Sequence, residues 1–168
     1  MPDIHYSNNN PTALTENLMA NVNAVKFLKF TATTINDLGL FREVGPEVTR
    51  KQEVNTPRCN IIYKGMAEHR ENSNQAVRDM RYAYELEVYV KNTKDEILAQ
   101  MLLYLAKKTE ETFATGSDNN TAIVFTEIDG HYDTIVEAAE MEDRSVGLGA
   151  NRIFSLGINI VYWVWEAR

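Results

Sequence analysis

Residues that could support chemistry are few in this sequence, and they are widely spaced. The three histidines are His5, His69 and His131, and none has a metal-ligand spacing to a cysteine, an acidic residue or another histidine. The sequence contains neither the G-x-S-x-G pattern of a nucleophile elbow nor the H-E-x-x-H pattern of a zinc hydrolase. We therefore expect no catalytic residue, no metal site and no bound cofactor, which predicts that the protein is not an enzyme.

Two further features deserve a chemical interpretation. Cys59 is the only cysteine, so an internal disulfide is excluded, and we expect it to be a small buried side chain in a strand rather than a reactive thiol. The segment Gly147-Leu148-Gly149 resembles a phosphate-binding loop only in part, because it lacks a third glycine and a following helix. We interpret that segment as a tight turn.

Length and composition predict one domain. A chain of 168 residues can bury a sizeable core, and residues 1–11 are polar and rich in asparagine, so we expect a flexible N-terminal arm and a single domain over residues 12–168. The formal net charge of −7 argues against a free nucleic-acid-binding protein. No apolar run reaches the ~18 residues of a membrane span, and no signal peptide is evident. We therefore expect the protein to be made in the cytoplasm and to have no membrane partner.

Apolar periodicity predicts two amphipathic helices. Apolar residues recur at steps of three and four from Leu14 to Ile35, which predicts one long helix from Thr12 to about Gly39. A second helix begins with the capping box formed by Thr93 and Glu96 and continues through an apolar stripe to about residue 116.

The strands are predicted by alternation and by turn residues. From Arg81 to Asn92 the alternation is strict, with Tyr82, Tyr84 and the following apolar residues on one face. The polar residues 65–79 before it lack a clear period, so we expect a mobile loop there. Further strands are predicted near residues 41–44, 52–54, 58–64, 122–129, 134–142 and 152–166.

This order of elements predicts an α+β fold, in which two main helices pack on a largely antiparallel, strongly bent β-sheet with long strands. The closing strand has about fifteen residues and at ~3.3 Å per residue would span roughly 50 Å. A globule of this length is only about 40 Å across, so the strand must bend, with Gly157 as the candidate bend, or extend beyond the globule.

The closing strand is apolar on both of its faces toward the end, and one chain has few elements left to cover both. A neighbouring subunit is the natural cover for the second face. We therefore predict that Tyr162, Trp163 and Trp165, together with Tyr82 or Tyr84, make subunit contacts. The alternative is that these aromatic residues pack in the core of their own chain.

Four segments carry a resemblance to a known family. They are TPRCNIIYKG, the strand YELEVYVKN, the helix TKDEILAQMLLYLAKKTEETF and the closing RIFSLGINIVYWVWEAR. In order and texture, about residues 12–166 resemble the tail terminator proteins of long-tailed bacteriophages. The resemblance implies a structural virion protein without catalysis or a cofactor. Such proteins form a ring, typically a hexamer, that caps the tail tube, ends tube polymerisation and provides the surface for attachment of the head connector.

The resemblance also implies partners and a location. The partners are further copies of the chain, the tail tube protein and a head-completion or connector protein, at the head-proximal end of the virion tail. DNA passes through the lumen without specific binding, which suits a net-acidic ring. Six residues are candidates for the lumen or the tube-facing surface: Glu137, Glu140, Glu142, Asp143, His69 and Arg70. The acidic run among them is otherwise interpreted as an ordinary solvated face.

Three alternatives remain open from the sequence. The chain could be another head–tail completion protein or a minor tail protein, or a module of a contractile, phage-derived machine. It could also be a small-molecule-binding or enzymatic α+β domain. That last alternative needs a pocket with converging polar groups, and no such cluster is evident in the sequence.

Overall fold

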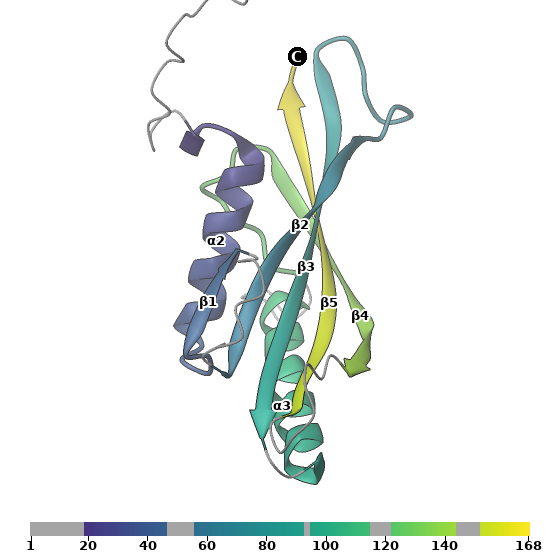
Figure 1. The fold of residues 1–168 in the computed structure, drawn as a ribbon. Helices are drawn as coiled ribbons and strands as arrows, with labels where there is room; N and C mark the ends of the chain where they lie inside the picture. Colours follow the sequence, from purple (N-terminus) through teal and green to yellow (C-terminus); the bar gives the residue numbers. More distant parts are fainter. Residues whose placement is uncertain (1–18, 47–55, 93–94, 115–121, 144–151) are drawn as a thin grey trace, which may run out of the picture.

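The computed structural model describes residues 19–46, 56–92, 95–114, 122–143 and 152–168. The predicted N-terminal arm, the first part of the predicted long helix and the predicted strand at 52–54 lie outside these residues. The elements, in chain order, are α2 (Asn23–Asp37), β1 (Glu43–Pro46), β2 (Arg58–Glu68), β3 (Val77–Asn92), α3 (Asp95–Ala114), β4 (His131–Asp143) and β5 (Arg152–Ala167) (Figure 1).

The five described strands form one sheet in the order β1-β2-β3-β5-β4. The short β1 runs parallel to β2, and every other neighbouring pair is antiparallel. Together with the two helices this confirms the predicted α+β class and the largely antiparallel sheet. The strong bend predicted at Gly157 is not confirmed, because the β3–β5 register continues without a shift through the pair Glu87–Gly157.

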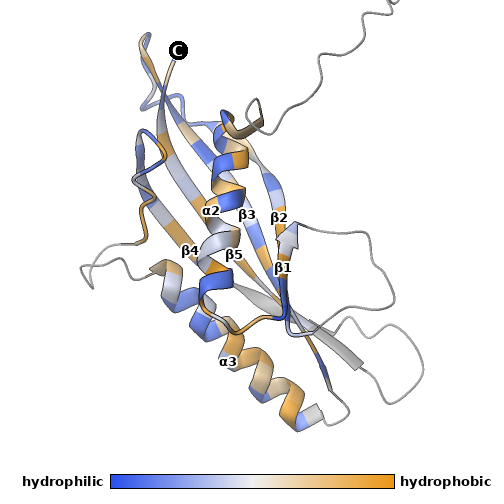
Figure 2. Ribbon diagram, turned by 90° about the vertical axis from the view of Figure 1, so that its left-hand side faces the viewer, coloured by the Kyte–Doolittle hydropathy of each residue, from blue (hydrophilic) through white to orange (hydrophobic). Residues whose placement is uncertain are grey.

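Both helices cover the same face of the sheet, as Figure 2 shows, and the core lies between them and that face. Alternate residues of β3 point into this core, as the strict alternation predicted, and β5 contributes the residues opposite them. The buried residues of these two strands on the helix-covered face are Met80, Tyr82, Tyr84, Leu86, Val88, Val90, Ile158, Ile160, Tyr162 and Val164.

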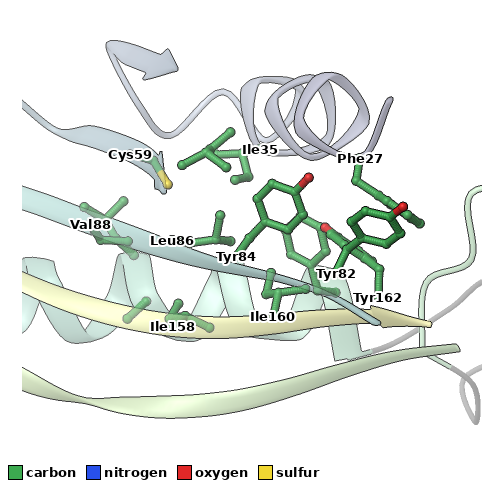
Figure 3. Close-up of a cluster of buried hydrophobic side chains, with 14 of the residues drawn as sticks. Phe27, Ile35, Cys59, Tyr82, Tyr84, Leu86, Val88, Ile158, Ile160 and Tyr162 are labelled. Atoms are coloured by element: carbon green, nitrogen blue, oxygen red, sulfur yellow. The ribbon is translucent and has the colours of Figure 1, made fainter. Parts of the chain in front are cut away.

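Helix α2 packs on this core through residues spaced four apart, Phe27, Thr31 and Ile35. The Phe27 ring stacks on the Tyr162 ring with centroids 4.5 Å apart, and the Thr31 and Tyr162 hydroxyls share a hydrogen bond of 2.6 Å (Figure 3). The predicted long helix is interrupted within the described residues, because Met19 and Ala20 are helical but Val22, directly before α2, is extended, with φ −87° and ψ 127°. An extended residue cannot continue a helix that precedes it.

The predicted loop at 65–79 is wrong, because β2 continues to Glu68 and β3 begins at Val77, so the segment is mostly a hairpin of two strands. Gly65 lies in the strand at a register shift and has φ +125°. The hairpin extends beyond the helices (Figure 1), so neither of its faces lies on the core and polar residues occupy both. Without one apolar face, these strand residues show no alternation of apolar and polar residues in the sequence.

The predicted strand at 122–129 is also wrong, since residues 122–125 have no regular structure and turns follow them. Phe125 lies in the core and Ile123 packs against it from this irregular segment, which is held by hydrogen bonds. The Ile123 N–H donates to the Phe113 carbonyl at 3.1 Å, and the Ile123 carbonyl accepts from the Thr134 hydroxyl at 2.6 Å. The predicted strand at 134–142 is confirmed as part of β4.

Cys59 and His131 are titratable residues to which the sequence analysis assigned no functional role, and both lie in the core. Cys59 is fully buried, and burial raises the pKa of its thiol to about 12, which agrees with the predicted unreactive cysteine. His131 was interpreted as a turn residue, yet it begins β4 and its ring packs edge-on against Phe27 at 5.0 Å. Its Nδ1 accepts the Phe125 N–H at 2.9 Å, so the ring is neutral with its proton on Nε2.

Burial lowers the pKa of His131 below the usual value of 6.5, and this predicts a pH dependence of stability. As the pH falls below about 6.5, the unfolded chain takes up this proton before the folded chain does, so the free energy of unfolding falls. His131→Gln should lower stability at neutral pH but remove this part of its fall between about pH 7.5 and about pH 5.5. Urea unfolding followed by tryptophan fluorescence measures both effects.

The reference for this prediction is the unmodified protein, measured over the same pH range. An equal slope of stability against pH in His131→Gln and in the unmodified protein would contradict the assignment to His131.

Candidate interaction surface

The face of the sheet without helices carries a group of aromatic and aliphatic side chains near the β2–β3 hairpin. We call this group the aromatic patch and define it as Tyr132 and Ile135 of β4 with Trp163 and Trp165 of β5. Tyr132, Ile135 and Trp165 are 41%, 41% and 39% exposed, and Trp163 is half-buried. The strand register places Trp163 beside Asp133 and Trp165 beside Asp79, opposite in direction to the core residues Tyr162 and Val164.

A buried carboxylate holds the patch in position. Asp79 has no solvent exposure, and its carboxylate accepts hydrogen bonds from the Tyr132 hydroxyl at 2.8 Å and from the Asn72 amide at 3.1 Å. Burial, and then the hydrogen bond to Asp79, raise the pKa of Tyr132, so its hydroxyl keeps the donated proton. The Tyr132 ring stacks on Trp165 with centroids 5.2 Å apart. The two exposed rings are therefore fixed in orientation.

The hairpin beside the patch is held by polar contacts to Arg168, which directly follows β5. The Arg168 N–H donates to the Ala76 carbonyl at 3.0 Å and its Nε donates to the Asn74 carbonyl at 2.7 Å. Its guanidinium also pairs with Glu68 at 2.7 Å. These contacts tie β5 to the hairpin, and the segment predicted to be a mobile loop is a hydrogen-bonded support for the patch.

The structure divides the residues predicted to make subunit contacts into two groups. Tyr82, Tyr84 and Tyr162 lie under α2 in the core of their own chain, so the alternative interpretation describes them and their predicted placement at an interface is corrected. This division arises because side chains alternate along a strand, and the even-numbered residues of β3 and β5 face the helices. Trp163 and Trp165 lie on the opposite face, where a partner can reach them.

The buried tyrosines have a structural role, which is to join the helix layer to the sheet. The Tyr84 hydroxyl donates to the Ala24 carbonyl of α2, and the Tyr82 hydroxyl donates to the Glu166 carboxylate. Burial raises the pKa of Tyr162, whose hydroxyl bonds to Thr31. Each ring fills the core while its hydroxyl finds a partner, as buried tyrosines usually do.

The six residues predicted for a lumen or tube-facing surface do not form one cluster. Glu137 is exposed in β4, and Glu140, Glu142 and Asp143 follow it in the same strand. His69 and Arg70 lie in the hairpin; the His69 ring meets the Trp163 ring edge-on at 5.8 Å, and its Nδ1 lies 3.7 Å from the Asp79 carboxylate. Asp143 pairs with Phe154, whereas Asp79 pairs with Trp165, about 35 Å farther along β5.

A shallow cavity of about 390 Å³ lies between the start of α2 and the end of β5. Its lining includes Asn23, Tyr82 and Glu166, and these polar groups are already engaged with one another. The Asn23 amide donates to Glu166 at 2.7 Å, and Arg78 lies 3.5 Å from the same carboxylate. The carboxylate therefore joins α2 to the sheet, and it is not aimed at a bound molecule.

The turn before β4 positions the patch, and Gly130 is required in it. Gly130 has φ +79°, and its carbonyl accepts the Trp165 N–H at 2.9 Å. A Cβ at this position would lie 2.1 Å from the Trp165 carbonyl oxygen. The turn was predicted from Asp129-Gly130, but no pattern in the sequence indicates that Gly130 contacts Trp165.

This contact predicts a large difference between two glycine substitutions. Gly130→Ala is expected to lower the free energy of unfolding by roughly 3 kcal/mol or more, because it adds a backbone clash to left-handed strain. Gly39→Ala should cost only about 1 kcal/mol, since Gly39 has φ +64° but open space where the Cβ would stand. Urea unfolding of both variants measures the difference, and equal losses would contradict the close approach of Gly130 to Trp165.

Comparison with protein-family models and with curated protein sequences found no match to this chain. Within the residues that the structure describes, no helix is both long and apolar enough to cross a membrane. The same residues contain no group of three or more His, Cys, Asp and Glu side chains arranged to hold a metal ion. We therefore base the functional proposal on the geometry of the aromatic patch together with the sequence resemblance.

Proposed function

We propose that this protein is a tail terminator of a long-tailed bacteriophage, a structural virion protein whose copies form a ring on the tail tube. The ring ends tube polymerisation and provides the surface to which the head connector attaches. The observation that carries the proposal is the aromatic patch, which is exposed on the helix-free face and fixed in orientation by Asp79 and Gly130.

The patch has the properties of a protein contact surface. Aromatic residues are enriched in such contacts because they bury a large area while ordering few rotatable bonds. Tyr132 and Trp165 are already ordered by their mutual stacking and by the hydrogen bond to Asp79, so binding a partner costs little additional side-chain entropy. The proposed ring brings further copies of the chain and the tail tube protein within reach of this patch.

The charge of the chain suits the proposed location. In the assembled particle the ring lies at the head-proximal end of the tail, after synthesis in the host cytoplasm, and DNA passes through it. Each copy adds a formal charge of −7, and a net-acidic ring does not retain DNA through phosphate contacts. The tail tube protein and a head-completion or connector protein are the partners above and below, and neither a cofactor nor catalysis is part of the role.

The test is a charge substitution in the patch, carried out in a phage that lacks its own copy of this gene. The variant Ile135→Lys with Trp165→Lys should fold, since both side chains are exposed, but should give tails of abnormal length or tails that do not join heads. The matched control is Leu103→Lys with Tyr104→Lys on α3, where the replaced side chains are 57% and 55% exposed. Tail length and head attachment are measured by electron microscopy, and folding by thermal unfolding of the purified variants.

Normal tails and infectious particles from the folded patch variant would contradict the proposal. Tails of normal length that lack heads would instead identify a head–tail completion protein. Abnormal tails with the α3 control as well would show that surface charge in general, and not the patch, is responsible.

A further inference from the structure

Two strand edges of the sheet are open among the described residues. Within the described part of the chain, β4 lies at one end of the strand order and pairs only with β5. At the other end, the described residues of β1 cover Arg58–Ile61 of β2, and among the described residues the strand pairs of 62–68 are all with β3. We call residues 62–68 the open half of β2. An open strand edge presents unpaired backbone N–H and carbonyl groups and is a natural site for another strand to add.

Exposed apolar side chains lie at both open edges. Tyr63 and Met66 of the open half of β2 are 47% and 63% exposed, and Ile135 of β4 is 41% exposed. A strand placed against either edge would cover these side chains. The two edges therefore share the features expected of a contact between chains.

The charges of β4 disfavour pairing between the β4 strands of two copies. The strand carries Asp133, Glu137, Glu140, Glu142 and Asp143, and the sequence from 131 to 143 has no lysine or arginine. Two β4 strands placed side by side would bring carboxylates opposite one another, and like charges in cross-strand positions are destabilising. A two-fold dimer through β4 is therefore disfavoured, and the edge needs a different partner.

The open half of β2 has the charge that β4 lacks. Lys64 is about half exposed and lies 2.9 Å from Glu85 on the helix-free face, and Glu68 is paired with Arg168. Glu137 of an incoming β4 would lie on the same face as Lys64 and can share it with Glu85. The contact between β4 and β2 thus brings opposite charges together.

The strand registers place these two edges at the same level of the sheet. Following the pairs across the sheet, Asp133 lies level with Trp163, Arg81 and Ala67. At the other end, Ala138 lies level with Ile158, Leu86 and Ile61, and Ile61 is the last residue that β1 covers. The segment from Asp133 to Ala138 is also free of register shifts, which occur on either side of it.

We infer that copies of the chain join through these edges, with Asp133–Glu137 of β4 pairing with the open half of β2 in the next copy. The inference rests on the proposed ring and names the surfaces that would form it. Because β2 and β4 run in opposite directions within one sheet, the new pair is antiparallel when the sheet continues from copy to copy. Level edges join without a shift along the strands, and a repeated head-to-tail contact of this kind closes into a ring where the rotation between copies divides a full turn.

The test is a disulfide between positions that the inference places opposite each other. Glu137 is level with Ile62 through Asn159 and Glu85. Within one copy β2 and β4 are three strand spacings apart, about 14 Å, so Ile62→Cys and Glu137→Cys cannot form a disulfide in the same chain. The native Cys59 is buried with a raised pKa and does not compete. The control pair is Leu103→Cys with Glu137→Cys, which keeps one position and moves the other to the exposed side of α3.

The double variants are oxidised at high concentration and in purified particles, and covalent multimers are counted on non-reducing gels beside a solution mass of the uncrosslinked protein. We expect Ile62→Cys with Glu137→Cys to give a ladder that stops at the size of the ring, while the control pair and each single variant stay largely monomeric.

A ladder without an upper limit would overturn the closed ring. A ring by mass that gives no crosslinks would overturn the edge pairing and leave the tail terminator proposal standing. Crosslinked rings from a phage whose tails are normal without this protein would overturn the proposed function and leave the edge pairing standing.

Discussion

The pairing of β3 with β5 is the constraint on which the other parts of the structure depend. Sixteen residues of each strand are in register from Val77–Ala167 to Asn92–Arg152, with no shift between them. Because side chains alternate along a strand, this one register decides which residues of both strands face the helices and which face away. A slip by one residue in either strand would exchange the core tyrosines with the patch tryptophans.

The two faces created by this register solve different physical problems. On the helix-covered face, tyrosine rings supply apolar volume, and their hydroxyls reach Thr31 and Ala24 of α2, so the helix is held at a defined position over the strands. On the other face, a carboxylate without solvent exposure, Asp79, is stabilised by neutral donors from β4 and from the hairpin. A buried carboxylate left without such donors would be costly, so the hairpin, β4 and β3 must come together for any of them to be stable.

Much of this fold follows from local sequence pattern. Strict alternation predicted β3, and the capping box with its apolar stripe predicted α3, because both signals report a single buried face that repeats at the period of the element. The closing strand β5 was predicted from its long apolar run. The hairpin escaped detection because it projects past the helices, where neither face needs apolar residues. Residues 122–125 were taken for a strand because Ile123 and Phe125 fill the core, and a pattern of buried residues does not say whether the backbone is paired.

The site was harder to predict than the fold. The alternation of side chains along a strand correctly grouped Tyr82, Tyr84 and Tyr162 on one face. The sequence does not say which face the helices cover, so the predicted subunit contact included residues of both faces. Asp79 gave no signal, since the hydroxyl that completes its shell belongs to Tyr132, 53 residues away. Long-range partnerships of single polar groups leave no periodic trace in a sequence.

The central pairing also has a consequence for the order of events as the chain is made. β3 acquires β2 as a neighbour through a short hairpin, but its other side must wait for β5, which is made only after α3 and β4. Contacts of such high sequence separation are slow to form, and until residues 152–167 leave the ribosome one long side of β3 stays unpaired. During that interval the unpaired backbone groups of β3 can pair with another chain, so a chaperone that shields exposed strands would act on the nascent protein before another copy does.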